Sequence, residues 1–415
     1  MSTQRTFQDM LNEYLPNKLL KEELLKRTWM LDNIQRDDSW GGDNIIVPFR
    51  GSKPSSLTLN KLTASSSVHE SALIRGSISS YQELWHALKL NFRDLSDHEG
   101  RVPEDTFLKV IPDEVEASME FFKMGLNTLL INGSSFAKME TSANSNVGVI
   151  VVDKVDKFEI GQEAVLDDDN SSATAVFITA INIEASTVTL SATRGGATAD
   201  YSAYTAAQNG KFYYPGAETA SFTSLRSALL SSANGGSASL HSVSKLAYPF
   251  LQCVNVSGAA ITEANILDKI FDALRDVQQK ARGGKISVAL MSLKNSASVL
   301  KAIQSEKGAF HVAPNSTKVS EYGWSEVMIG SPAGSMVRIV GAQEVDDDVI
   351  FLLDPKSMTF RSKGFIKKHK SPEGIEYFVE RDATAGYTYI VDLACFGELE
   401  VTKPGNNGVI HSISY

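Results

Sequence analysis

The sequence predicts an α+β fold in which a small all-β domain interrupts a larger body of helices and strands. A helical pattern of apolar residues covers 112–131, strict alternation replaces it over about 147–216, and helix and strand patterns mix from 222 onward. Spacings of three and four residues are typical of one face of a helix, whereas a period of two is typical of a half-buried strand.

The long helical pattern is the element around which we expect the fold to be organised. Its apolar residues are Val115, Met119, Phe122, Leu126, Leu129 and Leu130. Acidic residues crowd its amino end, where they suit the positive pole of a helix dipole, and Asn132-Gly133 supplies a stop. A helix over 112–131 would be about 30 Å long. Pro112 is either its first residue or a kink after a turn that begins at Pro103.

Two segments before this helix are expected to need a surface outside themselves. Residues 1–40 carry an interrupted apolar stripe, which predicts an arm with a helical part. Strand patterns at 44–49 and 71–79 flank a polar connection, so 41–82 is predicted to be a protruding hairpin. The connection is too poor in apolar residues to build a core, and the hairpin must lie on its own body or on a neighbouring subunit.

The segment after the helix predicts an inserted β domain. Residues 147–216 alternate apolar and polar side chains between turn clusters at 167–170 and 194–196. Such strands can close a core of their own, and we expect this domain to fold as a separate module.

The remainder of the chain predicts an α/β lobe. A helix is expected from about Thr262, as its N-cap, to Arg282, where Gly283-Gly284 ends it. A strand at 285–291 and a helix containing Val299 follow, and 327–401 is predicted to consist mostly of strands.

Composition excludes several classes of protein. The chain has 415 residues, a net charge of -9 and a pI of about 5.4, so tight direct binding of DNA is disfavoured. Cys253 and Cys395 lie far apart in apolar contexts, which predicts packed thiols and no disulfide framework. The first residues lack the layout of a signal peptide and no window approaches 18 apolar residues, so a soluble compartment and no membrane partner are expected.

No motif for catalysis, cofactor binding or metal binding is present in the sequence. GxGxxG, GxxxxGK[ST] and GxSxG are absent, and His69-Glu70 lacks the second His of a zinc protease helix. For the seven histidines a surface or structural role is favoured over a ligand role: His69, His86, His98, His241, His311, His369 and His411. We therefore expect no enzyme, and assign no catalytic, cofactor-binding or metal residue.

Three charged runs leave alternatives open. The acidic triplets at 167–169 and 346–348 are favoured as solvated turns over calcium sites, because neither continues into EF-hand spacing. The basic run 363–370 contacts packaged nucleic acid or an acidic neighbour, or it is simply a solvated hairpin face.

The order of these parts resembles the major capsid proteins of tailed phages, which have the Hong Kong 97-like fold. The strongest local match is MSLKNSASVLKAIQSEKGAF (291–310), similar to the strand, short helix and Lys-x-x-x-Gly segment of the family's A-domain. A second is MIGSPAGSMVRIV (328–340) followed by DDDVIFLLDPKSMTFRSKG (346–364), similar to the family's Gly-x-Pro stretch and returning strand.

The resemblance implies a division of the whole chain. It gives an N-terminal arm at 1–40, an E-loop hairpin at 41–82, a P-domain with spine helix at 83–146, the inserted β domain at 147–216, an A-domain at 217–334 and the returning strands and tail at 335–415. The implied function is that of a shell protein whose hexamers and pentamers form an icosahedral head around double-stranded DNA.

The implied partners are other copies of the chain, a separate scaffolding protein, a portal and, as an open option, decoration proteins. A separate scaffold is implied because the chain lacks the long charged amino-terminal coil of some members. The implied location is the virion, with assembly in the host cytoplasm. Two alternatives remain: an encapsulin-like nanocompartment with a protein cargo, and a multidomain hydrolase with a β accessory module.

A covalently cross-linked shell is not expected. Self-cross-linking members of the family join an E-loop Lys to an Asn near the returning strands of a neighbour, with a carboxylate as base. Lys53, Lys61 and Glu373 supply the amine and carboxylate, but no Asn lies between Asn315 and Asn406. Gln343 is the nearest amide and lies before the returning strands.

Overall fold

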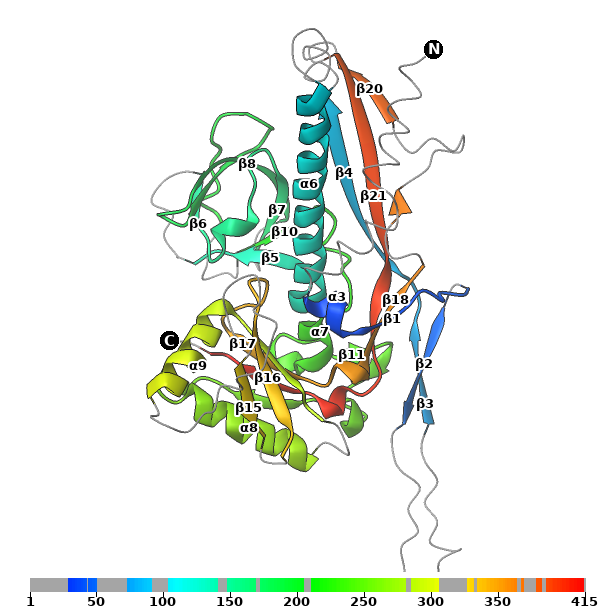
Figure 1. The fold of residues 1–415 in the computed structure, drawn as a ribbon, viewed down its shortest axis with the longest axis vertical. Coiled ribbons are helices and arrows are strands. Elements are labelled where there is room, and N and C mark those ends of the chain that lie inside the picture. Colours follow the sequence, from blue (N-terminus) through cyan, green and yellow to red (C-terminus); the bar gives the residue numbers. More distant parts are fainter. Residues whose placement is uncertain are drawn as a thin grey trace, which may run out of the picture. The chain divides into compact units, whose positions relative to one another are not determined.

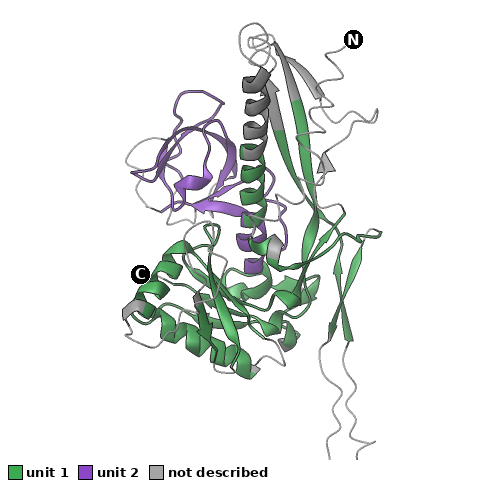
Figure 2. Ribbon diagram, viewed as in Figure 1, with its two compact units in different colours: residues 1–127, 227–415 green, residues 128–226 purple. Residues whose placement is uncertain are grey.

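The computed structural model describes residues 29–42, 44–50, 73–91, 104–140, 148–168, 172–204, 210–280, 285–305, 327–331, 334–363, 367–368, 378–382 and 386–413 (Figure 1). They belong to two compact units, one formed by 1–127 with 227–415 and the other by 128–226 (Figure 2). Helices and several sheets occur together, so the predicted α+β class is confirmed. No helix in these ranges is long and apolar enough to cross a membrane.

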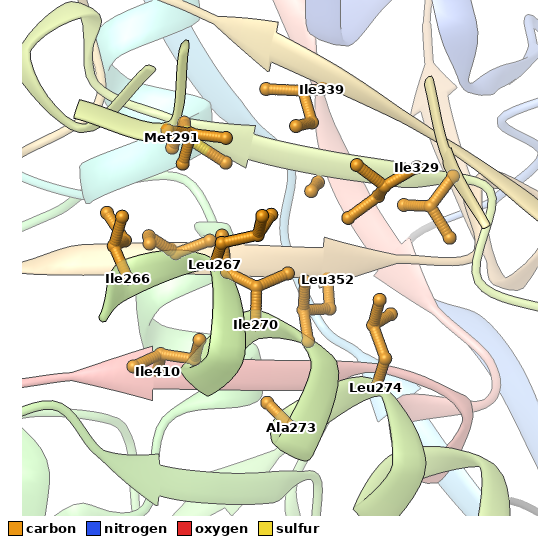
Figure 3. Close-up of a cluster of buried hydrophobic side chains, with 14 of the residues drawn as sticks. Ile266, Leu267, Ile270, Ala273, Leu274, Met291, Ile329, Ile339, Leu352 and Ile410 are labelled. Atoms are coloured by element: carbon orange, nitrogen blue, oxygen red, sulfur yellow. The ribbon is translucent and has the colours of Figure 1, made fainter. Parts of the chain in front are cut away.

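The α/β lobe is built on a six-stranded mixed sheet in the order β13-β22-β17-β14-β16-β15. The strands are β13 Val254–Ser257, β14 Val288–Met291, β15 Val327–Gly330, β16 Met336–Gly341, β17 Val349–Leu353 and β22 Gly408–His411. Helices α8 (Ile266–Lys280) and α9 (Leu293–Ser305) contribute to one core with this sheet, as Figure 3 shows for Ile270 and Leu274 of α8 beside Leu352 and Ile410.

The start of α8 differs from the prediction. Thr262 is not its N-cap, because the helix begins at Ile266 and the carbonyl of Asn265 accepts the first helical bond, from the Lys269 N–H at 3.1 Å. The side-chain oxygen of Asn265 accepts the Thr262 N–H at 2.7 Å and closes a turn before the helix. Because Asn265 closes a turn with Thr262, the helix starts after Asn265 and not after Thr262.

The long helix α6 spans Glu104–Asn132, so Pro112 is not its first residue. At 29 residues it is about 43 Å long. It runs beside the long strands β4 and β21 (Figure 1), and His86 of β4 hydrogen-bonds Ser118 of α6 at 2.6 Å.

Strand β21 is the centre of a second sheet in the same unit, which we call the spine sheet. The sheet follows the order β1-β18-β21-β19, and β4 and β20 also pair with β21. Its strands are β1 Gln35–Asp37, β4 Gln82–Asn91, β18 Met358–Ser362, β19 Lys367–Lys368, β20 Phe378–Asp382 and β21 Gly386–Val401. The short helix α3 (Trp29–Asn33) precedes β1.

The predicted hairpin strands are confirmed as β2 (Ile45–Arg50) and β3 (Leu73–Ile78), which pair antiparallel in a two-stranded sheet. The connection between them lies outside the described residues, as do most of the arm at 1–40 and the stretch 306–326.

The second unit contains a six-stranded antiparallel sheet in the order β5-β10-β7-β8-β9-β6. The strands are β5 Ser135–Lys138, β6 Val149–Val151, β7 Glu163–Asp167, β8 Thr174–Asn182, β9 Thr187–Ser191 and β10 Lys211–Tyr213. Its two ends meet, since the Glu140 N–H bonds the Val151 carbonyl at 3.1 Å and the Asp153 N–H bonds the Lys138 carbonyl at 3.0 Å. The sheet is therefore a closed barrel, and it includes a strand from before residue 147.

Side chains fill the interior of this barrel. Its core contains Phe136, Ile150, Val152, Phe158, Leu166, Val176, Ile178, Val188, Leu190 and Phe212, all almost fully buried. A six-stranded barrel packed in this way has a continuous core of its own, as the alternation in the sequence predicted.

Candidate interaction surface

The β2–β3 hairpin has two faces of different character. Val47 and Phe49 lie on a buried face and are 0% and 1% exposed. Ile46 and Leu73, which point to the other face, are 61% and 67% exposed. Since β2 and β3 pair only with each other among the described strands, this ribbon presents an outer face on which two apolar side chains are exposed, beside polar residues such as Arg75 and Ser77.

The buried face is fixed to the unit by a turn at residues 241–242. The ring of His241 stacks on Phe49 with centroids 6.1 Å apart, and its carbonyl accepts the Ser77 N–H at 2.9 Å. Gly76 permits this approach, because a Cβ there would lie 2.5 Å from the Phe49 ring and 2.9 Å from the His241 carbonyl. The base of the hairpin is thus tightly packed.

His241 also contacts the spine sheet. Its Nε2 accepts the backbone N–H of Val401, the last residue of β21, at 3.0 Å. Burial lowers the pKa of His241 to about 4, because the charged imidazolium loses its hydration. One side chain therefore connects the hairpin to the end of β21.

The turn that carries His241 is itself anchored. It joins β11 (Ser239–Leu240) to β12 (Val243–Ser244), and Lys245 follows directly. The Lys245 ammonium donates to the carbonyls of Ser227 and Leu230 at 2.6 and 3.0 Å, at the end of helix α7 (Leu225–Leu229). Burial lowers the pKa of Lys245 to about 8.

A row of aromatic rings lies on the face of the spine sheet that β4 turns away from α6. Trp40, Tyr81, Phe396 and Trp85 contact one another edge to face, with centroids 5.7, 5.9 and 5.4 Å apart in that order. Lys363 places its ammonium 5.0 Å from the Tyr81 ring centroid, a cation–π contact. Trp85, at the end of the row, is 45% exposed.

Residues 33–38 attach the arm to this unit. Arg361 of β18 pairs with Asp37 and with Glu400, whose side chain is 3% exposed. Ser362 donates to Asp38, and Arg338 donates to the Asn33 side chain at 3.0 Å. These contacts fix the point at which the chain passes from the arm to the hairpin.

Within the described part of the chain, the structure brings no candidate ligand or catalytic side chains together. His86, His241 and His411 lie apart in separate hydrogen-bond networks, and the other four histidines lie outside the described residues. Within those residues no group of three His, Cys, Asp or Glu side chains is placed to hold a metal. Both cysteines are buried thiols, as predicted, and burial raises their pKa values.

The charged runs are only partly described. Residues 346–348 form a turn in which the Asp347 carbonyl accepts from Asn295 and the Asp348 carbonyl from Ile413. Of the basic run, Lys363 contacts Tyr81 as above. The candidate cross-linking residues Lys53, Lys61 and Glu373 lie outside the described residues.

The sequence favours a surface or structural role for His241 but does not reveal its partners. The context Ser-Leu-His-Ser-Val gives no sign of a contact with strands far away in the sequence. The one available signal was Gly76 in the middle of a strand, which marks a close approach of another segment.

Comparison with known proteins gives structural matches only. No model of a known protein family matches the sequence, and no curated protein does. The capsid asymmetric unit of cyanophage A-1(L) is 11% identical, with 94% of this chain and 93% of that chain covered and a TM-score of 0.48. The capsid of a native GTA particle is 10% identical, with 94% and 92% covered and a TM-score of 0.44. The virus-like particle from Pyrococcus furiosus is 8% identical, with 95% and 96% covered and a TM-score of 0.41.

Proposed function

We propose that this chain is the major capsid protein of a tailed phage, a structural subunit that self-assembles into an icosahedral shell. The observation that carries the proposal is the β2–β3 hairpin. Its inner face packs on His241, and its outer face exposes Ile46 and Leu73 on a ribbon that is only two strands wide.

The energetics of the hairpin favour a neighbouring copy as its cover. Fully burying an exposed Ile or Leu side chain contributes on the order of 2 kcal/mol, and Ile46 and Leu73 are about two thirds exposed, so covering both gains about 2 to 3 kcal/mol before the cost of association. In a closed symmetric assembly every subunit makes this contact and receives it. A contact of this kind is therefore repeated throughout a shell.

Hexamers and pentamers around double-stranded DNA are the assembly that the resemblance implies. The net charge of -9 fits a container that holds DNA without binding it tightly, since like charges keep the packed genome free. A separate scaffolding protein, a portal and decoration proteins are proposed partners, the virion is the proposed location, and no catalytic role is proposed. The domain limits 1–40, 41–82, 83–146, 147–216, 217–334 and 335–415 are proposed with this reading, except that β5 (Ser135–Lys138) is assigned to the inserted β domain because it pairs in the barrel.

Electron microscopy and sedimentation of the wild-type chain, expressed alone and with neighbouring genes, test the proposal. The double variant Ile46→Ser with Leu73→Ser is expected to stay folded but not to form particles. Ile160→Ser with Ile183→Ser removes side chains of 69% and 78% exposure from the barrel and serves as the matched control. A wild-type protein found only as a compact monomer under all conditions would contradict the proposal.

The nanocompartment alternative predicts the same particles with a different content. Nucleic acid extracted from purified native particles distinguishes the two: double-stranded DNA of uniform length supports a phage head, and a protein cargo without DNA supports the alternative.

A further inference from the structure

We propose that His241 is an acid-sensitive latch, which holds the β2–β3 hairpin against the subunit as long as its imidazole ring is neutral. The latch is a property of the single subunit, so the inference goes beyond the assembly proposed above and does not depend on it.

The hydrogen bond to Val401 requires an unprotonated Nε2. A backbone N–H donates to this nitrogen, and an imidazolium has no lone pair to accept it. Protonation therefore replaces an attraction by two opposed N–H groups 3.0 Å apart. It also places a charge between Phe49 and a buried strand end, where little water is available to solvate it.

Backbone strain at the turn indicates that the contact is maintained against a cost. His241 and Ser242 both have positive φ, 48° and 67°, in a two-residue hairpin loop that Asn-Gly suits better. Left-handed conformations of such residues cost on the order of 1 kcal/mol each and persist when surrounding contacts fix them. Here those contacts are the Phe49 stack, the Ser77 N–H and the Val401 N–H.

The effect of opening is directional. The His241 carbonyl and the Ser242 hydroxyl bond the N–H and carbonyl of Ser77 in β3, at 2.9 and 3.3 Å. Lys245 holds the other end of the turn on α7, so when the ring contacts and these two Ser77 bonds open together, the hairpin detaches and the turn stays in place.

The charged groups near His241 do not account for the acid response in its place. On β3, Arg75 lies at a position that faces away from the buried side of the hairpin, since its neighbours Gly76 and Ile74 belong to that side. On β21, Glu400 is paired with Arg361, and Glu398 is a second buried carboxylate of that strand. On the turn's own element the charged group is Lys245, bound to two carbonyls.

The pH window follows from the two protonation equilibria. The pKa of His241 is about 4 in the closed form and about 6.5 once the ring is hydrated. Between these values the open form binds more protons, so the closed form is fully favoured above pH 6.5 and weakens as pH falls toward 4. Between pH 7.5 and 4.5 the opening equilibrium constant is expected to rise roughly 100-fold.

Hydrogen exchange of the full chain, followed by mass spectrometry at pH 7.5 and 4.5 and corrected for intrinsic rates, tests the latch. The amides of Ser77 and Val401, which bond His241 directly, are expected to lose protection by roughly 100-fold on acidification, read from peptides covering 73–79 and 397–402, while peptides of β14 and β17 keep theirs. His241→Gln retains a neutral acceptor and is expected to show the same protection at both pH values.

His86→Gln is the matched control, because burial lowers the pKa of His86 as well and it bonds only Ser118 among the contacts of its ring nitrogens. This variant is expected to keep the wild-type response at 73–79. Should His241→Gln fail to fold, the comparison of wild-type protection at pH 7.5 and 4.5 still tests the proposal. Unchanged protection of 73–79 at pH 4.5, or the same loss in His241→Gln, overturns the proposal.

Discussion

Asn407 is the residue whose replacement tests most directly how the two sheets of the larger unit are joined. It is fully buried beside both chain crossings between them, one from β17 to β18 and one from β21 to β22. Its Oδ1 accepts the Asp354 N–H at 2.8 Å, and its Nδ2 donates to Ser357 Oγ at 3.0 Å and to the Lys403 carbonyl at 3.2 Å. One amide therefore binds both crossings.

The cost of Asn407→Ala can be worked from these bonds. Three well-formed hydrogen bonds contribute about 1 kcal/mol each, and a buried Asp354 N–H left without an acceptor adds to the loss. We expect the free energy of unfolding of this unit to fall by about 3 to 4 kcal/mol, which corresponds to a decrease in Tm on the order of 5 °C. Asn406→Ala is the control, because Asn406 is partly exposed and has one long bond, 3.5 Å, to Asp354.

A second substitution separates the amide's chemistry from its volume. Asn407→Asp keeps the shape but directs a carboxylate at the carbonyls of Lys403 and Pro404, which accept from the amide nitrogen in the native protein. It is expected to destabilise more than Asn407→Ala at pH 7 and less as pH falls, since protonation restores a donor. Calorimetry of the purified chain measures all three variants. Equal stabilities of Asn407→Ala and Asn406→Ala would refute the reasoning.

Three further predictions concern the arm, the barrel and the absence of cross-links. Arg361→Met leaves the buried Glu400 carboxylate without its cation and is expected to cost about 3 kcal/mol in urea unfolding. Arg275→Met, in which Arg275 and its partner Asp272 are both about half exposed, is expected to cost less than about 0.5 kcal/mol. Replacing 135–213, which covers the whole barrel from β5 to β10, by a Gly-Ser linker is expected to leave α6 and the α/β lobe folded by circular dichroism and proteolysis, and unfolding of the whole chain would show that this boundary is wrong. Particles boiled in detergent are expected to run near 45.1 kDa, and covalent oligomers that survive reductant would contradict the missing-Asn argument.

Local sequence determined the elements whose pattern is long and regular. Met119, Phe122 and Leu126 repeat at helical spacing and line the buried side of α6, and the alternation around Val176 and Ile178 gives the barrel interior. Burial of one face is decided by periodicity alone, so such elements need no knowledge of their neighbours. The two strands of the hairpin at 45–78 were predictable for the same reason.

Tertiary structure alone decided the contacts between residues distant in sequence. The short strand β5 joins the barrel because β10 and β6 close around it, and four residues are too few to show a period. His241, Arg361 and Asn407 look like ordinary loop or strand residues in the sequence, and each acquires its role from partners on other elements. Hydrogen bonds and ion pairs depend on atomic positions to within about an ångström, and only the folded chain sets these positions. The sequence therefore determined the helices and strands, whereas the contacts between them were decided by the tertiary structure.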